Sequence, residues 1–183
     1  MSFIGHGPLQ GFPVSPRSGN EIALVAERTR SSLGVTGPVF LPELVLESLS
    51  IFGVTLDVIE DADSELPKGV EACWIPDTVE LLIRESVYLA ACDREPRAMF
   101  TVAHELGHLA LGHRRTFNRG AASCRVFEDS EWQANTFAAE FLMPLKLIRF
   151  HRVVTPEQMV RVFGVSQQAA ETRIAKLRKS GAI

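Results

Sequence analysis

Residues 101–113, with the sequence TVAHELGHLALGH, contain the pattern His-Glu-x-x-His. On an α-helix, positions four residues apart differ by about 40° around the axis, so His104 and His108 project from one face. Two neutral imidazoles at this spacing can bind one Zn²⁺. Glu105 lies beside the first histidine, where it can reach a water molecule and act as a general base without being a ligand. The segment therefore predicts a helix that supplies two metal ligands and a catalytic carboxylate.

The rest of this helix favours a metal site over a chance match to the pattern. Its opposite face is apolar and consists of Met99, Val102, Leu106, Leu109 and Ala110. Such a face anchors a helix in a hydrophobic core. Two histidines and a glutamate on the same helix then need partners to offset their burial.

The third ligand decides the class of metal site. A further histidine in the metzincin pattern would need a glycine at position 111 and a histidine at position 114, but the chain has Leu111 and Arg114. His113 is one residue short, so that class is disfavoured. The alternative is a carboxylate from the next helix, which we expect over about 127–142.

Four acidic residues of that segment are candidates for the third ligand: Glu128, Asp129, Glu131 and Glu140. Glu131 shares a helix face with Asn135, which can hydrogen-bond a ligand histidine. Small residues on this face, Ala134 and Ala138, allow close packing against the first helix. Glu128 is the second choice, and Glu140 is expected to be a solvated or structural acid.

Residues 99–113 (MFTVAHELGHLALGH) and 131–144 (EWQANTFAAEFLMP) together resemble the ImmA/IrrE family of zinc metallopeptidases. The resemblance extends weakly over residues 20–183. It implies thermolysin-like chemistry with one Zn²⁺ per chain, although Mn²⁺ or Fe²⁺ also suits two histidines and a glutamate. It also implies that His104, His108 and Glu131 are the metal ligands and that Glu105 is the catalytic acid and base.

The resemblance also implies a substrate, because members of this family commonly cleave a helix-turn-helix repressor and thereby release transcription. We therefore expect a zinc endopeptidase that acts on a specific protein. One alternative is a DNA- or protein-binding regulator with a structural or latent zinc site, whose open position a residue such as His6 would fill. Another is a latent protease that single-stranded DNA activates.

The composition is that of a globular protein, with 183 residues of which 46% are hydrophobic and 22% charged. No apolar stretch is long enough for a membrane helix, so we expect no membrane partner. The odd number of cysteines (Cys73, Cys92 and Cys124) favours free thiols and a cytoplasmic location. Residues 1–19 are rich in Gly, Pro and Ser and predict a flexible N-terminal tail without the features of a signal peptide.

The order of the predicted elements favours an α+β fold with a small sheet. Strands are expected over 54–59, 71–75 and 79–84, after one pair of helices and before the metal-site helices. We assign 20–150 to a metallopeptidase domain.

Residues 151–183 predict two helices in a helix-turn-helix-like subdomain. The segment 145–183 has a net charge of +6, against −9 for the rest of the chain. We expect the second helix to present Gln167, Gln168 and Arg173 outward, where DNA contact is one use and a covering of the peptidase core is the other.

Two questions stay open at the level of sequence. The first is the role of His113, for which a cationic imidazole stabilised by the end of its helix is expected. The second is which group stabilises an oxyanion, for which Tyr88, His113 and Arg97 are candidates.

Overall fold

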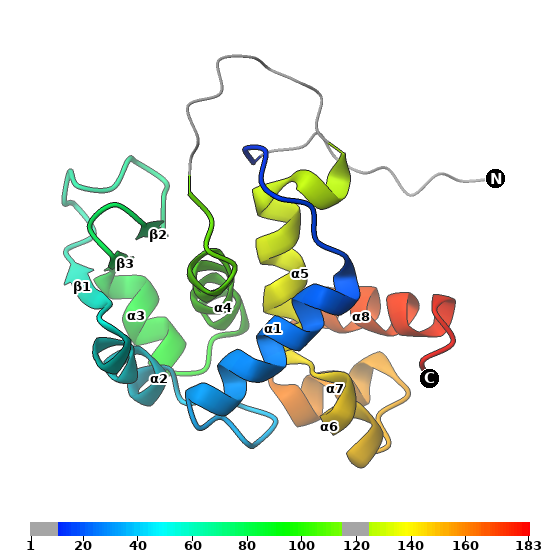
Figure 1. Ribbon diagram of the computed structural model, residues 1–183. Helices are drawn as coiled ribbons and strands as arrows, with labels where there is room; N and C mark the ends of the chain where they lie inside the picture. Colours follow the sequence, from blue (N-terminus) through cyan, green and yellow to red (C-terminus); the bar gives the residue numbers. More distant parts are fainter. Residues whose placement is uncertain (1–10, 115–124) are drawn as a thin grey trace.

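A computed structural model describes residues 11–114 and 125–183 of the chain, and it confirms the α+β fold (Figure 1). The helices are α1 (Gly19–Ser32), α2 (Pro42–Ser48), α3 (Glu85–Cys92), α4 (Pro96–Ala110), α5 (Ser130–Leu142), α6 (Leu145–Phe150), α7 (Pro156–Phe163) and α8 (Gln167–Lys179). The strands are β1 (Thr55–Ile59), β2 (Ala72–Ile75) and β3 (Glu80–Arg84), and two short 3-10 helices are η1 (Leu49–Phe52) and η2 (Val126–Glu128).

The three strands form one sheet in the order β1-β3-β2. Strand β3 pairs in parallel with β1 and antiparallel with β2. Strand β2 lies at an edge of this sheet, so part of its backbone has no strand partner among residues 11–114 and 125–183, and this edge packs against α4 (Figure 1). The sheet therefore lies on one side of α4, and α5 lies on the other.

Helix α3 is not predicted by the sequence analysis. It begins at Glu85, directly after β3, and its N-cap residue Arg84 makes no capping hydrogen bond with its side chain. A helix without a capping side chain leaves little local signal. Its formation depends on packing against α4 and the sheet.

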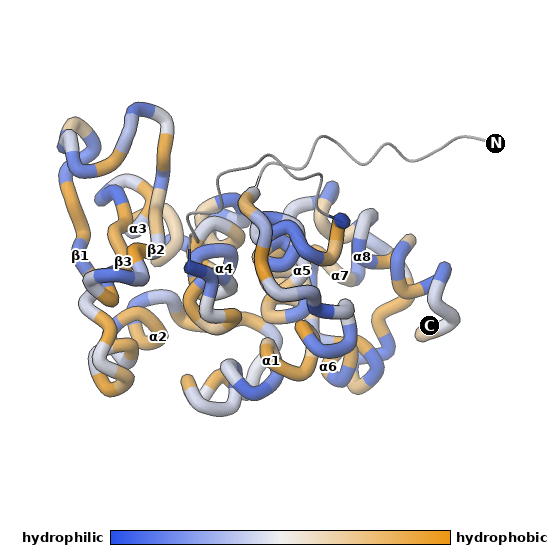
Figure 2. Tube along the Cα trace, turned by 45° about the horizontal axis from the view of Figure 1, so that its top comes forward, coloured by the Kyte–Doolittle hydropathy of each residue, from blue (hydrophilic) through white to orange (hydrophobic). Residues whose placement is uncertain are grey.

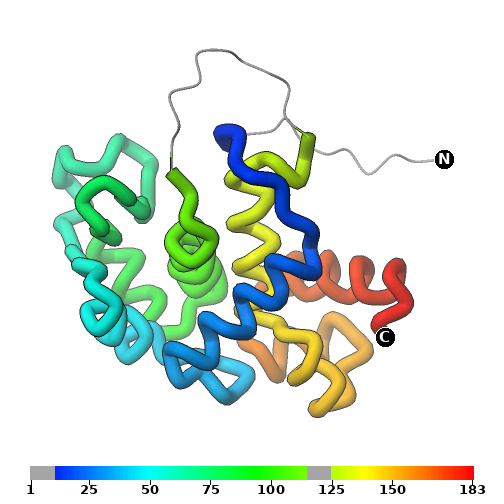
Figure 3. Tube along the Cα trace, in the orientation of Figure 1, coloured from blue at the N-terminus to red at the C-terminus, as the bar shows by residue number. Residues whose placement is uncertain are grey.

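Helices α4 and α5 approach each other closely at one glycine. A Cβ added to Gly107 would lie 3.2 Å from both the Cα and the carbonyl oxygen of Ala134, and 3.1 Å from the ring of Phe137. The absence of a side chain at position 107 therefore allows close approach of the two helices, which lie side by side in Figure 3. This contact brings the metal-site segments of the two helices together.

The hydrophobic core surrounds this helix pair. Val102 and Leu106 of α4, Phe137 and Phe141 of α5, and Ile22 of α1 are fully buried. Figure 2 shows hydrophobic and hydrophilic residues alternating along the helices. No helix in the described ranges has both the length and the hydropathy needed to cross a bilayer.

The N-terminal segment 11–17, part of the stretch 1–19 that is expected to be a flexible tail, is hydrogen-bonded to the start of α5 (Figure 3). The backbone N–H groups of Gly11 and Phe12 donate to Asp129 and Ser130 over 3.0 and 3.1 Å. The N–H of Val14 donates to a backbone carbonyl of η2. These bonds join residues far apart in sequence, so local composition does not indicate them. Residues 1–10, including His6, lie outside the described residues.

The C-terminal helices have the predicted turn, but Arg173 is not exposed. Gly164 adopts a left-handed conformation after α7, and the Ser166 hydroxyl caps α8. Arg173 is 3% exposed and forms a two-pronged ion pair with Glu140 of α5. The expectation that Arg173 points outward is therefore wrong, because this ion pair joins α8 to the core. The boundary between 20–150 and 151–183 stays a prediction.

Replacement of Gly107 tests the close helix contact. We expect Gly107→Ala to lower the free energy of unfolding slightly and Gly107→Val to lower it by about 1–3 kcal/mol, because the added atoms force α4 and α5 apart. Urea denaturation of the metal-free protein measures both changes. Helix propensity alone favours alanine over glycine by about 1 kcal/mol, so a clear stabilisation by both variants would contradict the contact.

Removal of one partner tests the pair between Glu140 and Arg173. We expect Glu140→Leu to destabilise the protein by about 3–5 kcal/mol, because a buried guanidinium then lacks its counter-charge. The double variant Glu140→Leu/Arg173→Met should recover most of this loss. Thermal and urea unfolding give the free energies of unfolding of the wild type, both single variants and the double variant. If the effects of the two single replacements simply add up in the double variant, the two side chains do not interact.

Candidate metal centre

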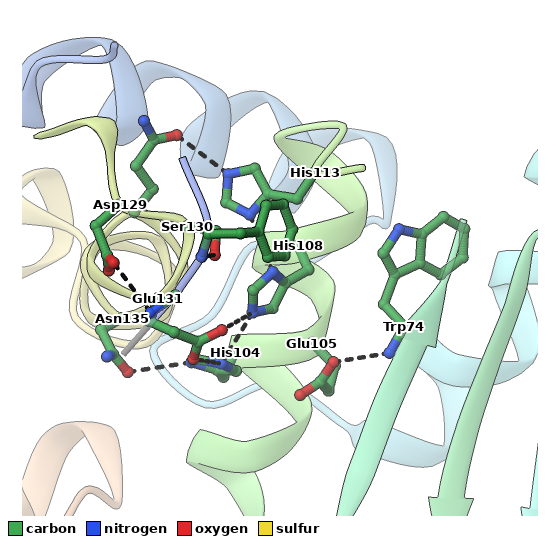
Figure 4. A network of polar contacts seen from close by, with 12 residues as sticks. Trp74, His104, Glu105, His108, His113, Asp129, Ser130, Glu131 and Asn135 are labelled. Atoms are coloured by element: carbon green, nitrogen blue, oxygen red, sulfur yellow. Dashed lines mark hydrogen bonds and ion pairs between the residues drawn. The ribbon is translucent and has the colours of Figure 1, made fainter. Parts of the chain in front are cut away.

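Three side chains from α4 and α5 converge at one point (Figure 4). His104 and His108 project from the same face of α4, as predicted, and Glu131 faces them from the first turn of α5. The Glu131 carboxylate lies 3.1 Å from Nε2 of His104 and 3.3 Å from Nε2 of His108. The two Nε2 atoms are 3.1 Å apart.

These distances fit a single metal ion. Two donor atoms bound to one Zn²⁺ at a tetrahedral angle are about 3.4 Å apart, given bonds of 2.0–2.1 Å. The separations among His104, His108 and Glu131 lie close to that value. Two imidazole nitrogens and a carboxylate are also a donor set that transition metals prefer. The group can therefore hold a metal ion, and its composition alone does not decide which one.

The electrostatics of the group favour a bound cation. Hydrogen bonds with His104 and His108 hold the pKa of Glu131 far below its usual value, so the carboxylate is ionised. Burial lowers the pKa of His104, but the hydrogen bond to Glu131 and the charges of Glu105 and Glu131 outweigh this and raise it overall. The charge of the carboxylates therefore attracts a positive group to this point, whether a proton or a metal ion.

Glu105 is on α4, next to the three candidate ligands, and a hydrogen bond from the sheet holds its carboxylate. The backbone N–H of Trp74, on the free edge of β2, donates to its Oε2 over 2.9 Å (Figure 4). Burial raises the pKa of Glu105, which suits a group that accepts and returns a proton near neutral pH. No local sequence feature indicates the contribution of Trp74, because it depends on which strand lies at the edge.

The other acidic candidates for the third ligand are engaged elsewhere. Asp129 caps α5 through the N–H of Trp132, and Glu128 accepts a hydrogen bond from the N–H of Arg125. Glu140 is paired with Arg173. Of the four candidates, Glu131 alone belongs to the metal-binding group that the described residues form.

Polar side chains behind the histidines orient both rings. Asn135 lies 3.1 Å from Nδ1 of His104, as expected from its position on α5. His113 lies 3.0 Å from Nδ1 of His108 and 3.1 Å from the amide of Gln133. Burial lowers the pKa of His113 to about 4, so the predicted cationic role is wrong. No sequence pattern marks Gln133, because its partners come from distant segments.

The candidates for oxyanion stabilisation lie in different places. His113 contacts the edge of His108 that faces away from the metal point. Tyr88 lies near Cys92 and two acids of α2, away from the ligands. Arg97 is paired with Glu71.

Cys73 and Cys92 are free thiols, as expected, and Cys124 lies outside the described residues.

A groove of about 710 Å³ lies next to the point where His104, His108 and Glu131 converge. It begins at Asn135 and at Phe100, whose ring is 6.3 Å from that of His104. Its walls come from α4, α5 and α8. The lining is mainly apolar and includes Phe100, Trp132, Ala139, Leu142, Met143 and Ala169. A groove of this shape and character suits a chain segment with apolar side chains.

A solved structure, described as a Mycobacterium tuberculosis transcriptional regulator, is similar to this fold. The match has a TM-score of 0.52 and 19% sequence identity, and it covers 82% of this chain and 45% of that one. The chain thus corresponds to less than half of that protein, and the similarity concerns the fold alone. No curated protein matches the sequence.

The sequence profile of the peptidase M78 family, described as the IrrE N-terminal-like domain, matches residues 62–175. The matched range is more than half of the chain, and it includes the sheet edge, α4, α5 and the three converging ligands. It agrees with the expected resemblance to the ImmA/IrrE proteins. The chain therefore belongs to the peptidase M78 family and contains its metallopeptidase-like domain.

Proposed function

We propose that this protein is a zinc endopeptidase that hydrolyses a peptide bond in a specific protein, a helix-turn-helix transcriptional repressor, and so regulates transcription. The observation that supports it most is the joint placement of three metal ligands and a buried carboxylate. His104, His108 and Glu131 would hold the ion, and Glu105 lies beside them. A purely structural zinc site needs no such carboxylate.

The proposed reaction gives Glu105 two proton transfers. The bound zinc supplies Lewis-acid chemistry, which lowers the pKa of water and polarises the peptide carbonyl. Glu105 accepts a proton as the water oxygen bonds to the carbonyl carbon, and it returns that proton to the leaving amine as the C–N bond breaks. The hydrogen bond from Trp74 keeps one carboxylate oxygen in place during both steps.

The apolar groove supports a polypeptide substrate. It extends from Asn135, which contacts His104, toward α8, and its residue Lys176 adds a cation at the α8 wall. A segment of an unfolded or partly unfolded protein would bury apolar side chains there. The helix-turn-helix-like pair thus helps to form the proposed substrate site. Contact of 151–183 with DNA stays a prediction.

The proposed substrate class rests on the family membership and on the similar structure, which is described as a transcriptional regulator. The alternative is a DNA- or protein-binding regulator with a structural or latent zinc site. The two hypotheses differ in whether regulation requires Glu105.

Metal analysis tests the ligand set. We expect about one zinc ion per chain, and we expect Glu131→Ala to weaken zinc affinity more than about 100-fold, since loss of an outer partner alone costs 10–100-fold. Glu128→Ala is the matched control and should keep the metal. Elemental analysis and calorimetric titration measure the effect. Full zinc binding by Glu131→Ala would contradict the assignment, and a preference for Mn²⁺ or Fe²⁺ would correct the ion.

Replacement of Glu105 tests catalysis. We expect Glu105→Gln to keep its zinc but to cleave a substrate about 10²–10⁴-fold more slowly, because the amide cannot accept a proton. Repressors encoded near the gene of this protein are the first substrates to test, with mass spectrometry of the products. Normal transcriptional regulation by Glu105→Gln would support the binding regulator instead. Cleavage of other proteins but of no repressor would contradict the substrate class alone.

A further inference from the structure

The chain turns back at the end of α4, so that His113 packs against His108 of the same helix. Gly112 adopts a left-handed conformation with φ of 68°. The N–H of His113 donates to the carbonyl of His108 over 2.9 Å, and the N–H of Gly112 donates to that of Leu109 over 3.0 Å. This pair of bonds is a Schellman motif, in which the residue after the glycine contacts the residue five positions earlier. Here the two contacting side chains are imidazoles.

The orientation of Gln133 follows from two backbone carbonyls. Its side-chain nitrogen donates to the carbonyl of Ser15 over 2.9 Å and to that of Phe127 over 2.8 Å. Reversal of the amide would place its oxygen against both carbonyl oxygens, which is repulsive. The amide oxygen of Gln133 must therefore face His113, where it accepts a hydrogen bond from Nε2 over 3.1 Å.

This acceptor decides where His113 holds its proton. A neutral imidazole has a single N–H, and Gln133 requires that it be on Nε2. Nδ1 of His113 then has a free lone pair, and it lies 3.0 Å from Nδ1 of His108. A hydrogen bond between these two atoms requires the proton on His108. His113 is 4% exposed, so water does not compete for this contact.

We infer that His113 is a positioning residue that, together with Gln133, holds the proton of His108 on Nδ1 and leaves its Nε2 free to bind the metal. The N-terminal segment 11–17 takes part, because the carbonyl of Ser15 helps to orient Gln133. This inference rests on the metal site of the proposed function but not on peptide hydrolysis. It gives His113 a role different from both roles that the sequence suggests.

Two replacements of His113 separate this role from simple packing. Glutamine at position 113 offers an acceptor to His108 and a donor to Gln133, whereas leucine offers neither and leaves two buried polar atoms unpaired. We expect His113→Leu to lower zinc affinity about 10–100-fold and His113→Gln to lower it less than about tenfold. A packing role predicts the reverse order, since leucine suits a buried position better.

Calorimetric titration with Zn²⁺ gives the affinities, and circular dichroism confirms that each variant folds. Equal affinities in the two variants, or wild-type affinity in His113→Leu, would overturn the inference. Glu105→Gln serves as the control for the proposed function, since it should lose cleavage while its zinc affinity stays near that of the wild type.

The position of the proton is also directly measurable. In ¹⁵N-labelled wild-type protein, two-bond ¹H–¹⁵N NMR spectra distinguish protonated from bare imidazole nitrogens. We expect His113 to be protonated on Nε2 and bare on Nδ1 with or without zinc, because it does not contact the metal. In the zinc-loaded protein His108 should be protonated on Nδ1. A proton on Nδ1 of His113 would overturn the inference, even if the protein bound no zinc.

Discussion

The close contact between α4 and α5 at Gly107 is the constraint on which the candidate metal centre depends. His104 and His108 flank this glycine on α4, and Glu131 lies one turn before Ala134, which the glycine contacts. The distance between the helices therefore sets the distance between ligands that come from different parts of the chain. A side chain at position 107 would separate the histidines from the carboxylate before it disturbed either helix by itself.

The ligands are supported from several elements because buried polar groups need partners. Asn135 contacts His104 from α5, and His113 contacts His108 from the end of α4. Trp74 holds Glu105 from the edge of the sheet. The small sheet thus does more than complete the core, since the N–H of Trp74 at its β2 edge positions the proposed acid and base. Such support lowers the freedom of each ring and carboxylate before a metal binds.

The C-terminal helix α8 packs against α5, the helix that carries Glu131. The buried pair between Glu140 and Arg173 joins α8 to α5, and the groove next to the metal point uses both helices as walls. The net positive charge of this part of the chain therefore does not by itself indicate a free basic surface. Part of it neutralises an acid of the core.

The sequence by itself determined the helix with His104 and His108, the class α+β and the choice of Glu131 among four acids. Periodicity, ligand spacing and small residues on one helix face are local properties, so a sequence contains them directly. Tertiary structure alone decided the contacts of Trp74, His113 and Gln133 and the inward direction of Arg173. Each of these depends on a hydrogen bond or ion pair between distant segments. Local sequence does not specify which segments will meet, because packing of the whole chain selects them.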